Sequence, residues 1–249
     1  MFSFLKRKNS IDLPGYLPIQ TDIHSHILPG IDDGSPDIET SLQLVKGMYD
    51  LGIRKATATP HIMGDMYHNN PQIINAALEK LQLACAAAQI NIELGAAAEY
   101  MLDDYFMKIL KNNEPLLTIH KNIILTEQSY AVKSSNLKEI SFEIMLGGYK
   151  AIMAHPERYS FYHNDYDSFF YLKDLGFLLQ VNLLSLTGYY GDQVKKAAKF
   201  ILKENLADLV GTDMHHIGHL TMLQNRKNLE IFRSSLDGRT YNILDDLVF

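Results

Sequence analysis

Seven short runs rich in β-forming residues recur along the 249-residue chain, with helical patterns between them. The runs lie at residues 19–23, 53–59, 92–98, 122–126, 150–154, 177–181 and 208–212. A strand–helix unit repeated at about 30 residues favours a parallel sheet. Seven such units predict a closed or nearly closed α/β barrel, with a doubly wound open sheet as the alternative. That alternative is weaker because no glycine-rich nucleotide fingerprint follows the first run.

Two helices have clear amino-terminal signals. In Ser35-Pro36-Asp37 we expect Ser35 to cap a helix whose first turn contains Pro36 and Asp37, and Asn70-Pro71 opens the next helix in the same way. Further helices are predicted at residues 137–147, 165–175, 192–205 and 220–234.

No linker or composition shift marks a second domain. We therefore expect residues 19–249 to form one barrel and residues 1–18 to form a flexible or peripheral arm. The net charge of −6 argues against general nucleic-acid binding, which needs a basic surface. No stretch approaches the roughly 20 apolar residues of a membrane span, and the short apolar start does not fit a signal peptide. These features predict a cytoplasmic protein.

Cys85 is the only cysteine, so no intrachain disulfide can form. It lies in an Ala- and Leu-rich helical pattern, where a buried, inert thiol is expected. This position argues against cysteine-based phosphatase chemistry.

Side chains suited to metal binding fall at the carboxyl ends of six of the seven runs, and Asn182 ends the other. Barrel enzymes build their active sites at these ends. His24 and His26 are expected on one face of the first strand because side chains alternate along a strand. The candidate ligands are His24, His26, Asp33, His61, Glu99, Glu127, His155, Asp213 and His215.

Nine nitrogen and oxygen donors are too many for one ion and, without a thiolate, suit two or three Mn²⁺, Fe or Zn²⁺ ions. Three dications with four carboxylates and a bridging hydroxide would leave a charge of about +1, which attracts a phosphate dianion. Such ions lower the pKa of a bridging water and clamp phosphoryl oxygens during in-line displacement. Arg158 is predicted to bind the phosphate, with an ion pair to Glu157 or another acid as the alternative.

Together these residues resemble the PHP superfamily, named for polymerase and histidinol phosphatase. Within it, the chain is most similar to the CpsB/CapC-type tyrosine phosphatases of bacterial capsule and exopolysaccharide operons. The resemblance rests on the stretch from Asp22 to Gly34, on Thr59-Pro60-His61 and Glu99-Tyr100, on the stretch from His155 to Tyr159, and on Thr212-Asp213-Met214-His215.

The resemblance implies a distorted (β/α)7 TIM-like barrel, the PHP fold, with three metal ions, usually Mn²⁺. One ion would be bound by His24, His26, Glu99 and Asp213, a second by Glu99, Glu127 and His155, and a third by Asp33, His61 and His215. Arg158 would hold the phosphate. The implied substrate is the phosphotyrosine tail of a membrane-bound bacterial tyrosine kinase that controls polysaccharide export, which would bring the protein to the inner membrane face.

The sequence departs from the family pattern after Asp213. Relatives often carry an arginine a few residues later, whereas this chain has His216-Ile217-Gly218-His219 and no arginine until Arg226. We expect His216 or His219 to replace that phosphate contact. Two other functions stay open at this point: a small-molecule phosphoesterase such as a histidinol phosphatase, and a non-catalytic, metal-stabilised protein that binds a kinase.

Overall fold

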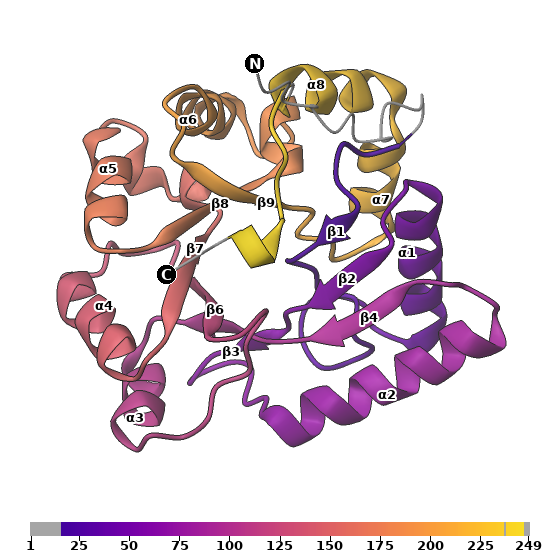
Figure 1. Cartoon of the computed structure of the whole chain (residues 1–249), viewed down its shortest axis with the longest axis horizontal. Helices are drawn as coiled ribbons and strands as arrows, with labels where there is room; N and C mark the ends of the chain where they lie inside the picture. Colours follow the sequence, from indigo (N-terminus) through magenta and orange to yellow (C-terminus); the bar gives the residue numbers. More distant parts are fainter. Residues whose placement is uncertain (1–15, 237, 247–249) are drawn as a thin grey trace, which may run out of the picture.

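The strands form two sheets in the computed structural model, which describes residues 16–236 and 238–246. One sheet has the order β1 (Thr21–Asp22), β2 (Lys55–Ala58), β4 (Glu93–Ala96). The other has the order β3 (His61–Ile62), β5 (Glu99–Met101), β6 (Ile123–Glu127), β7 (Lys150–Ala154), β8 (Leu178–Asn182), β9 (Ala207–Gly211). Every ladder between these strands is parallel, as predicted from the strand–helix alternation. The strands lie in a ring with the helices outside it (Figure 1).

Two of the seven predicted strands, at residues 53–59 and 92–98, are each followed by a short strand beyond the predicted run. Thr59 and Pro60 separate β2 from β3, and Ala97 and Ala98 separate β4 from β5. Pro60 has no N–H to donate to a ladder, which explains an interruption at this point. The neighbouring strand breaks at the same level, because β2 pairs with β4 while β3 pairs with β5. The shared break gives the distorted barrel that the family resemblance implies.

Side chains largely complete the contact between β1 and β9. An isolated bridge joins Ser25 to Met214 beyond the ends of the two strands. The Asp22 carboxylate accepts hydrogen bonds from both the backbone N–H and the hydroxyl of Thr212, at 2.9 and 2.6 Å. The side-chain amide of Asn242 then bonds to backbone groups of both strands. Polar side chains therefore replace a regular hydrogen-bonded ladder between the last strand, β9, and the first strand, β1.

Eight α-helices are present in the described part of the chain, and in Figure 1 they surround the strands. They are α1 (Ile38–Asp50), α2 (Pro71–Ala87), α3 (Asp104–Lys111), α4 (Leu137–Leu146), α5 (Asp167–Asp174), α6 (Asp192–Lys203), α7 (Ile217–Gln224) and α8 (Arg226–Leu236). Short 3₁₀ turns are η1 (Pro156–Arg158), η2 (Ser160–Tyr162), η3 (Leu183–Thr187) and η4 (Leu244–Asp246).

Three details of the predicted helices were wrong. Asp37 caps α1 and accepts from the Thr40 N–H, whereas Ser35 was expected to do so. The single helix predicted at 220–234 is two helices, because Asn225 is extended and its side chain accepts from a backbone N–H of the next helix. Helix α3, capped by Asp103, was not predicted. The Asn70 cap of α2 is confirmed.

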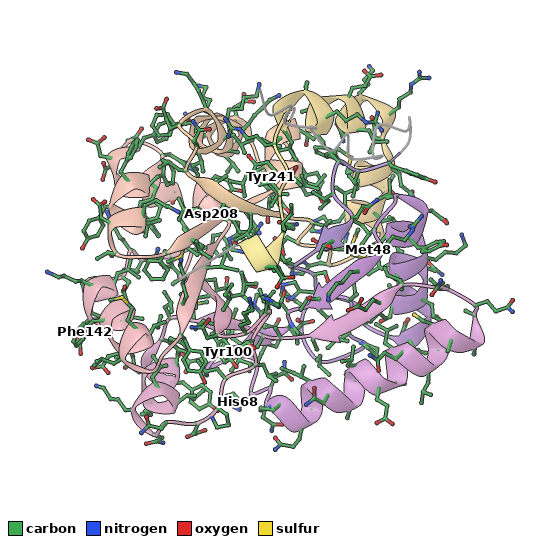
Figure 2. All side chains as sticks on the ribbon, in the orientation of Figure 1. Met48, His68, Tyr100, Phe142, Asp208 and Tyr241 are labelled. Atoms are coloured by element: carbon green, nitrogen blue, oxygen red, sulfur yellow. The ribbon has the colours of Figure 1, made fainter. Side chains whose placement is uncertain are left out.

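The barrel interior contains a compact apolar cluster, here called the inner plug. It consists of Ile23, Ile123, Leu125, Ile152, Ala154, Leu178 and Leu209, and none of these is more than 5% exposed. Leu244 of η4 packs against the inner plug, and η4 lies over the centre of the ring in Figure 1. A larger apolar cluster fills the layer between strands and helices. Figure 2 shows the two sides of that layer, with Tyr100 buried inside it and Phe142 of α4 at the outer surface.

Most of the predicted amino-terminal arm, residues 1–15, lies outside the described residues. Of the rest, Leu17 is buried, and its N–H donates to the carbonyl of Leu51 at 2.8 Å. No helix in the described ranges is long and apolar enough to cross a membrane.

Candidate metal centre

All nine predicted ligands converge in one cluster. Glu127 ends β6 and His155 follows β7, but Glu99 was predicted to end the third strand and instead opens β5, as His61 opens β3. The donor atoms of the nine residues form four overlapping groups, each lying within 4.8 Å: His26, Asp33, His61 and His215; His24, His26 and Asp213; His24, Glu99 and His155; and His61, Glu99 and Glu127. Eight of the nine are buried or nearly so, and Asp33 is exposed. The structure therefore brings these widely spaced side chains together in one cluster, and their role as metal ligands stays a prediction.

Glu99 lies at the centre of the cluster. Its Oε2 is 3.3 Å from Nε2 of both His24 and His26, and its Oε1 is 3.1 Å from Nε2 of His155. The four groups differ in several respects from the ligand sets that the family resemblance implies. His26 joins the group of Asp33, Asp213 is grouped without Glu99, and His24 is grouped with His155. Glu127 is grouped with His61, at 2.8 Å, and not with His155. Which donors share an ion stays a prediction.

His24 and His26 do not lie on a strand, contrary to the prediction, because β1 ends at Asp22. Two hydrogen bonds to the segment after β9 hold them instead. The His26 N–H donates to the carbonyl of Met214, and the Asp213 N–H donates to the carbonyl of His24. The two rings still reach the same place, with their Nε2 atoms 3.3 Å apart. The first pair of ligands is thus positioned by a contact between the two ends of the strand ring.

Two ligands have left-handed backbone conformations. His155 has φ 34° and Asp213 has φ 51°, a region that costs a non-glycine residue about 1–3 kcal/mol. Along β7, Ile152 and Ala154 point into the inner plug, so simple alternation would turn His155 away from the interior. The left-handed turn at His155 brings its ring to Glu99. Strain of this kind is typical of functional sites.

Two residues that we did not predict contact the Nδ1 atoms of His24 and His26, on the side of each ring away from Nε2. Nδ1 of His26 is 2.8 Å from Oδ2 of Asp32, and Nδ1 of His24 is 2.7 Å from Oε1 of Gln180. Histidine ligands usually donate their second N–H in this way, which fixes the ring orientation. Asp32 had a sequence signal because it adjoins Asp33 in the first motif. Gln180 had none beyond its place two residues before Asn182.

Four buried polar atoms of the cluster make no well-aligned hydrogen bond within residues 16–236 and 238–246: Nδ1 of His61, both carboxylate oxygens of Glu99, and Oε1 of Glu127. Their close contacts are with one another and with the other histidines of the cluster. Burial and the nearby Glu99 charge raise the pKa of Glu127 to about 7. Burial also lowers the pKa of His155 to about 4. Buried polar atoms without well-aligned hydrogen bonds are costly, and a cation would satisfy them. This donor set therefore fits divalent metal ions.

Arg158 lies beside the cluster between two tyrosine rings. Its guanidinium carbon is 5.0 Å from the ring centre of Tyr130 and 4.3 Å from that of Tyr190. Its Nη1 donates to Oδ2 of Asp213 at 2.6 Å, so the acid partner is Asp213 and not Glu157. The side chain is 23% exposed. Arg158 is therefore anchored at one edge and accessible at another.

The two histidines expected to replace the missing arginine differ in burial. His216 is exposed and caps α7, with its ring nitrogen accepting from the His219 N–H. His219 is buried, its ring lies 5.7 Å from that of His215, and burial lowers its pKa to about 4. His68 is exposed and donates to the Gly64 carbonyl in the loop between β3 and α2 (Figure 2). None of these three belongs to a ligand group.

The fold and the cluster together define a PHP-type barrel with a candidate multinuclear metal centre. Comparison with known sequences leads to the particular family. The chain belongs to the family described as "Capsular polysaccharide synthesis, CpsB/CapC", whose family model matches residues 20–226.

Individual relatives support this assignment. A protein named putative tyrosine-protein phosphatase CapC, from Staphylococcus aureus, is 27% identical over 89% of this chain and 88% of its own. Tyrosine-protein phosphatase YwqE from Bacillus subtilis is 27% identical over 79% of this chain and 77% of its own. A solved structure from work on YwqE and on CpsB of Streptococcus pneumoniae, described as unique metal-dependent tyrosine phosphatases, superimposes with a TM-score of 0.77. It is 25% identical and covers 90% of this chain and 89% of that one.

Proposed function

We propose that this protein is a metal-dependent protein-tyrosine phosphatase. The observation that carries the proposal is the convergence of nine donor side chains beside an anchored arginine, with several buried donor atoms that make no well-aligned hydrogen bond. Membership of a family whose named relatives are tyrosine-protein phosphatases supports the same activity. No buried nucleophile is needed, and the lone Cys85 is buried away from this site in α2.

The nine donors are proposed to hold divalent ions, with three Mn²⁺ ions as the expected set. Bound ions of this kind lower the pKa of water and neutralise phosphoryl oxygens. The protein's own contribution is to place the phosphate. A guanidinium has five N–H donors, so Arg158 can keep one on Asp213 and present others to phosphate oxygens. We propose His216 and His219 as the residues that replace the absent second arginine.

Aromatic side chains near the cluster favour an aryl phosphate. The ring of Tyr67 stacks on that of His61 at 5.5 Å, and the ring of Tyr130 stacks on that of His155 at 5.8 Å. Tyr130 is 42% exposed and Tyr189 is 39% exposed. Rings that are partly open to solvent can stack on the leaving phenol of phosphotyrosine. We propose that the natural substrate is the phosphotyrosine tail of a membrane-bound bacterial tyrosine kinase, met at the cytoplasmic face of the membrane.

The test compares three substrates with the Mn²⁺-loaded protein: a phosphotyrosine peptide, a phosphoserine peptide and histidinol phosphate. Phosphate release from the phosphotyrosine peptide alone, abolished by a chelator and restored by Mn²⁺, is the expected result. Turnover of histidinol phosphate alone would replace the proposal with a small-molecule phosphoesterase. No turnover of any substrate by the metal-loaded protein would favour a non-catalytic binding role.

A further inference from the structure

Strand β8 is the strand whose carboxyl end carries Asn182 where the other predicted strands carry ligand-type residues. Gln180 and Asn182 lie two residues apart on it, so their side chains share one face, and both are fully buried. They fill the space between two candidate ligands from other segments, His24 after β1 and Asp213 after β9. Their role follows from the order in which their hydrogen bonds connect.

Four hydrogen bonds form a continuous line. Arg158 and the Asn182 amide nitrogen both donate to Oδ2 of Asp213, at 2.6 and 2.7 Å. The Asn182 amide oxygen accepts from the Gln180 amide nitrogen at 2.8 Å. The Gln180 amide oxygen lies 2.7 Å from Nδ1 of His24. The line therefore starts at the candidate phosphate-binding arginine and ends at a candidate metal ligand.

The direction of every bond in this line is set from one end. A carboxylate can only accept, so Asn182 must turn its NH₂ group toward Asp213 and its oxygen toward Gln180. Gln180 must then turn its own NH₂ group toward Asn182 and its oxygen toward His24. The oxygen accepts, so Nδ1 of His24 must carry a proton. The other ring nitrogen, Nε2, is left to face the cluster.

The same line orients Asp213. With two donors on Oδ2, the other oxygen faces the cluster, where Oδ1 lies 3.3 Å from Nε2 of His24 and 3.6 Å from Nε2 of His26. His24, His26 and Asp213 form one of the four ligand groups. The line therefore orients two members of the same candidate ion site, His24 and Asp213.

Gly211 on β9 gives independent evidence that the Gln180 amide and His24 are tightly packed at this point. A Cβ at this position would lie 2.8 Å from the amide nitrogen of Gln180 and 2.9 Å from Cβ of His24. Gly211 does not have a left-handed φ, so a glycine is required here because a side chain would not fit and not because of its backbone conformation. Even an alanine here would push the Gln180 amide off its partners.

We propose that Gln180 and Asn182 are positioning residues that form a buried amide relay, orienting His24 and Asp213 toward one metal ion and coupling that ion to Arg158. The proposal rests on the metal site of the proposed function but not on the identity of the phosphate ester. Outer-shell partners of this kind typically change metal affinity 10–100-fold when they are removed.

The test uses the full chain and two readouts that need no substrate. Mn²⁺ affinity of the metal-free protein is measured by titration for wild type, Gln180→Leu, Asn182→Leu and Gly211→Ala. The controls are Asn228→Leu, which removes a buried amide bonded to the Met222 carbonyl between α7 and α8, and Gly95→Ala, where an added Cβ meets nothing within 4 Å. In parallel, the Zn²⁺-loaded, ¹⁵N-histidine-labelled protein reports the His24 Nδ1–H signal, assigned by its loss in His24→Gln.

We expect a slowly exchanging Nδ1–H proton on His24 in wild type and in both controls. Gln180→Leu should abolish its protection and weaken the tightest Mn²⁺ binding about 10–100-fold. Asn182→Leu and Gly211→Ala should weaken binding in the same direction. Gly211→Ala retains both amides and so tests the relay even if the leucine variants do not fold.

Wild-type Mn²⁺ affinity with an unchanged Nδ1–H signal in Gln180→Leu or in Gly211→Ala would overturn the relay. Because neither readout involves hydrolysis, a protein that passes both and yet releases no phosphate from phosphotyrosine would refute the proposed function alone.

Discussion

The two ends of the barrel interior are built by the same strands but have opposite chemistry. On β6, Ile123 and Leu125 point into the inner plug, and Glu127, two residues further along the same face, belongs to the metal cluster. On β8, Leu178 packs in the inner plug, and Gln180 begins the amide relay. A single inward-facing row therefore changes from apolar to polar within one step of alternation.

The difference separates the part of the interior that holds the barrel together from the part that can bind ions. Every member of the inner plug has apolar neighbours and Leu244 packs over the cluster, so its burial stabilises the fold directly. The metal cluster buries charges and, within the described chain, gives the carboxylate oxygens of Glu99 close histidine contacts but no well-aligned hydrogen bond. It is stable only because the rest of the barrel holds it in place. Substitutions in the two regions should accordingly have separable effects.

The largest effect on activity is expected from His155→Ala. The change removes a donor whose Nε2 faces Glu99 at 3.1 Å, and with it part of the metal site. Turnover of the phosphotyrosine peptide should fall at least about 100-fold, and bound metal per chain should fall in elemental analysis. Far-UV circular dichroism should stay that of the wild type. His68→Ala is the matched control, because His68 lies outside every ligand group and should keep full activity. Wild-type metal content in His155→Ala would contradict the ligand assignment.

Ile123→Ala should show the reverse behaviour. Ile123 is fully buried in the inner plug, and truncating such a residue costs about 2–5 kcal/mol of unfolding free energy through lost burial and a cavity. Urea unfolding measures the loss, and Ile123→Val should lose about 0.5–1.5 kcal/mol. Metal content and turnover of the folded protein should not change. If Ile123→Ala lost metal without losing stability, the two ends of the interior would not be separable.

Arg158→Ala should impair substrate binding more than metal binding. Charged hydrogen bonds contribute about 1.5–3 kcal/mol, so KM for the phosphotyrosine peptide should rise about 10–100-fold. Metal content should be retained, because Asn182 still donates to Asp213. Arg158→Lys should restore little, since an ammonium cannot reproduce the planar fork. An unchanged KM with reduced metal content would make Arg158 a structural partner of Asp213 instead.

The smallest effect is expected from Cys85→Ala. The thiol is buried in α2, and burial raises its pKa, so it is a poor nucleophile near neutral pH. Turnover should equal that of the wild type, and stability should fall by about 1 kcal/mol. Thiol alkylation followed by an activity assay checks the same point, and inactivation of wild type but not of Cys85→Ala would contradict it.

Strand and helix patterning predicted much of the fold, and residues at or just after the predicted strand ends, with Asp33 from the loop after the first strand, supplied the nine side chains that the structure brings together. Those predictions succeed because parallel strands bring their carboxyl ends to one edge whatever the details of the connections. The wrong details are local. Ser35 and Asp37 both satisfy the local rules for a helix cap, and in the structure Asp37 caps α1. The helix predicted at 220–234 is interrupted at Asn225, a boundary that the local pattern did not mark.

The residues that act through other residues were not predicted, although Asp32 adjoins Asp33 in the first motif. Gln180 and Asp32 matter because of which nitrogen of His24 and His26 they touch, and that depends on contacts between segments far apart in the chain. The left-handed conformation of His155 is likewise not predictable from the sequence, because only a small minority of histidines adopt it even though His is enriched in this region.

The sequence by itself determined the alternation of strands and helices, the parallel arrangement of the strands, and the nitrogen and oxygen donors that exclude a thiolate centre. Only the tertiary structure decided how those donors are aimed. It joined β1 to β9 through the Asp22 carboxylate, turned His155 inward, and ordered the hydrogen bonds from Arg158 to His24. The reason is physical: burial and alternation are properties of short segments, whereas the direction of a hydrogen bond depends on partners that only folding brings together.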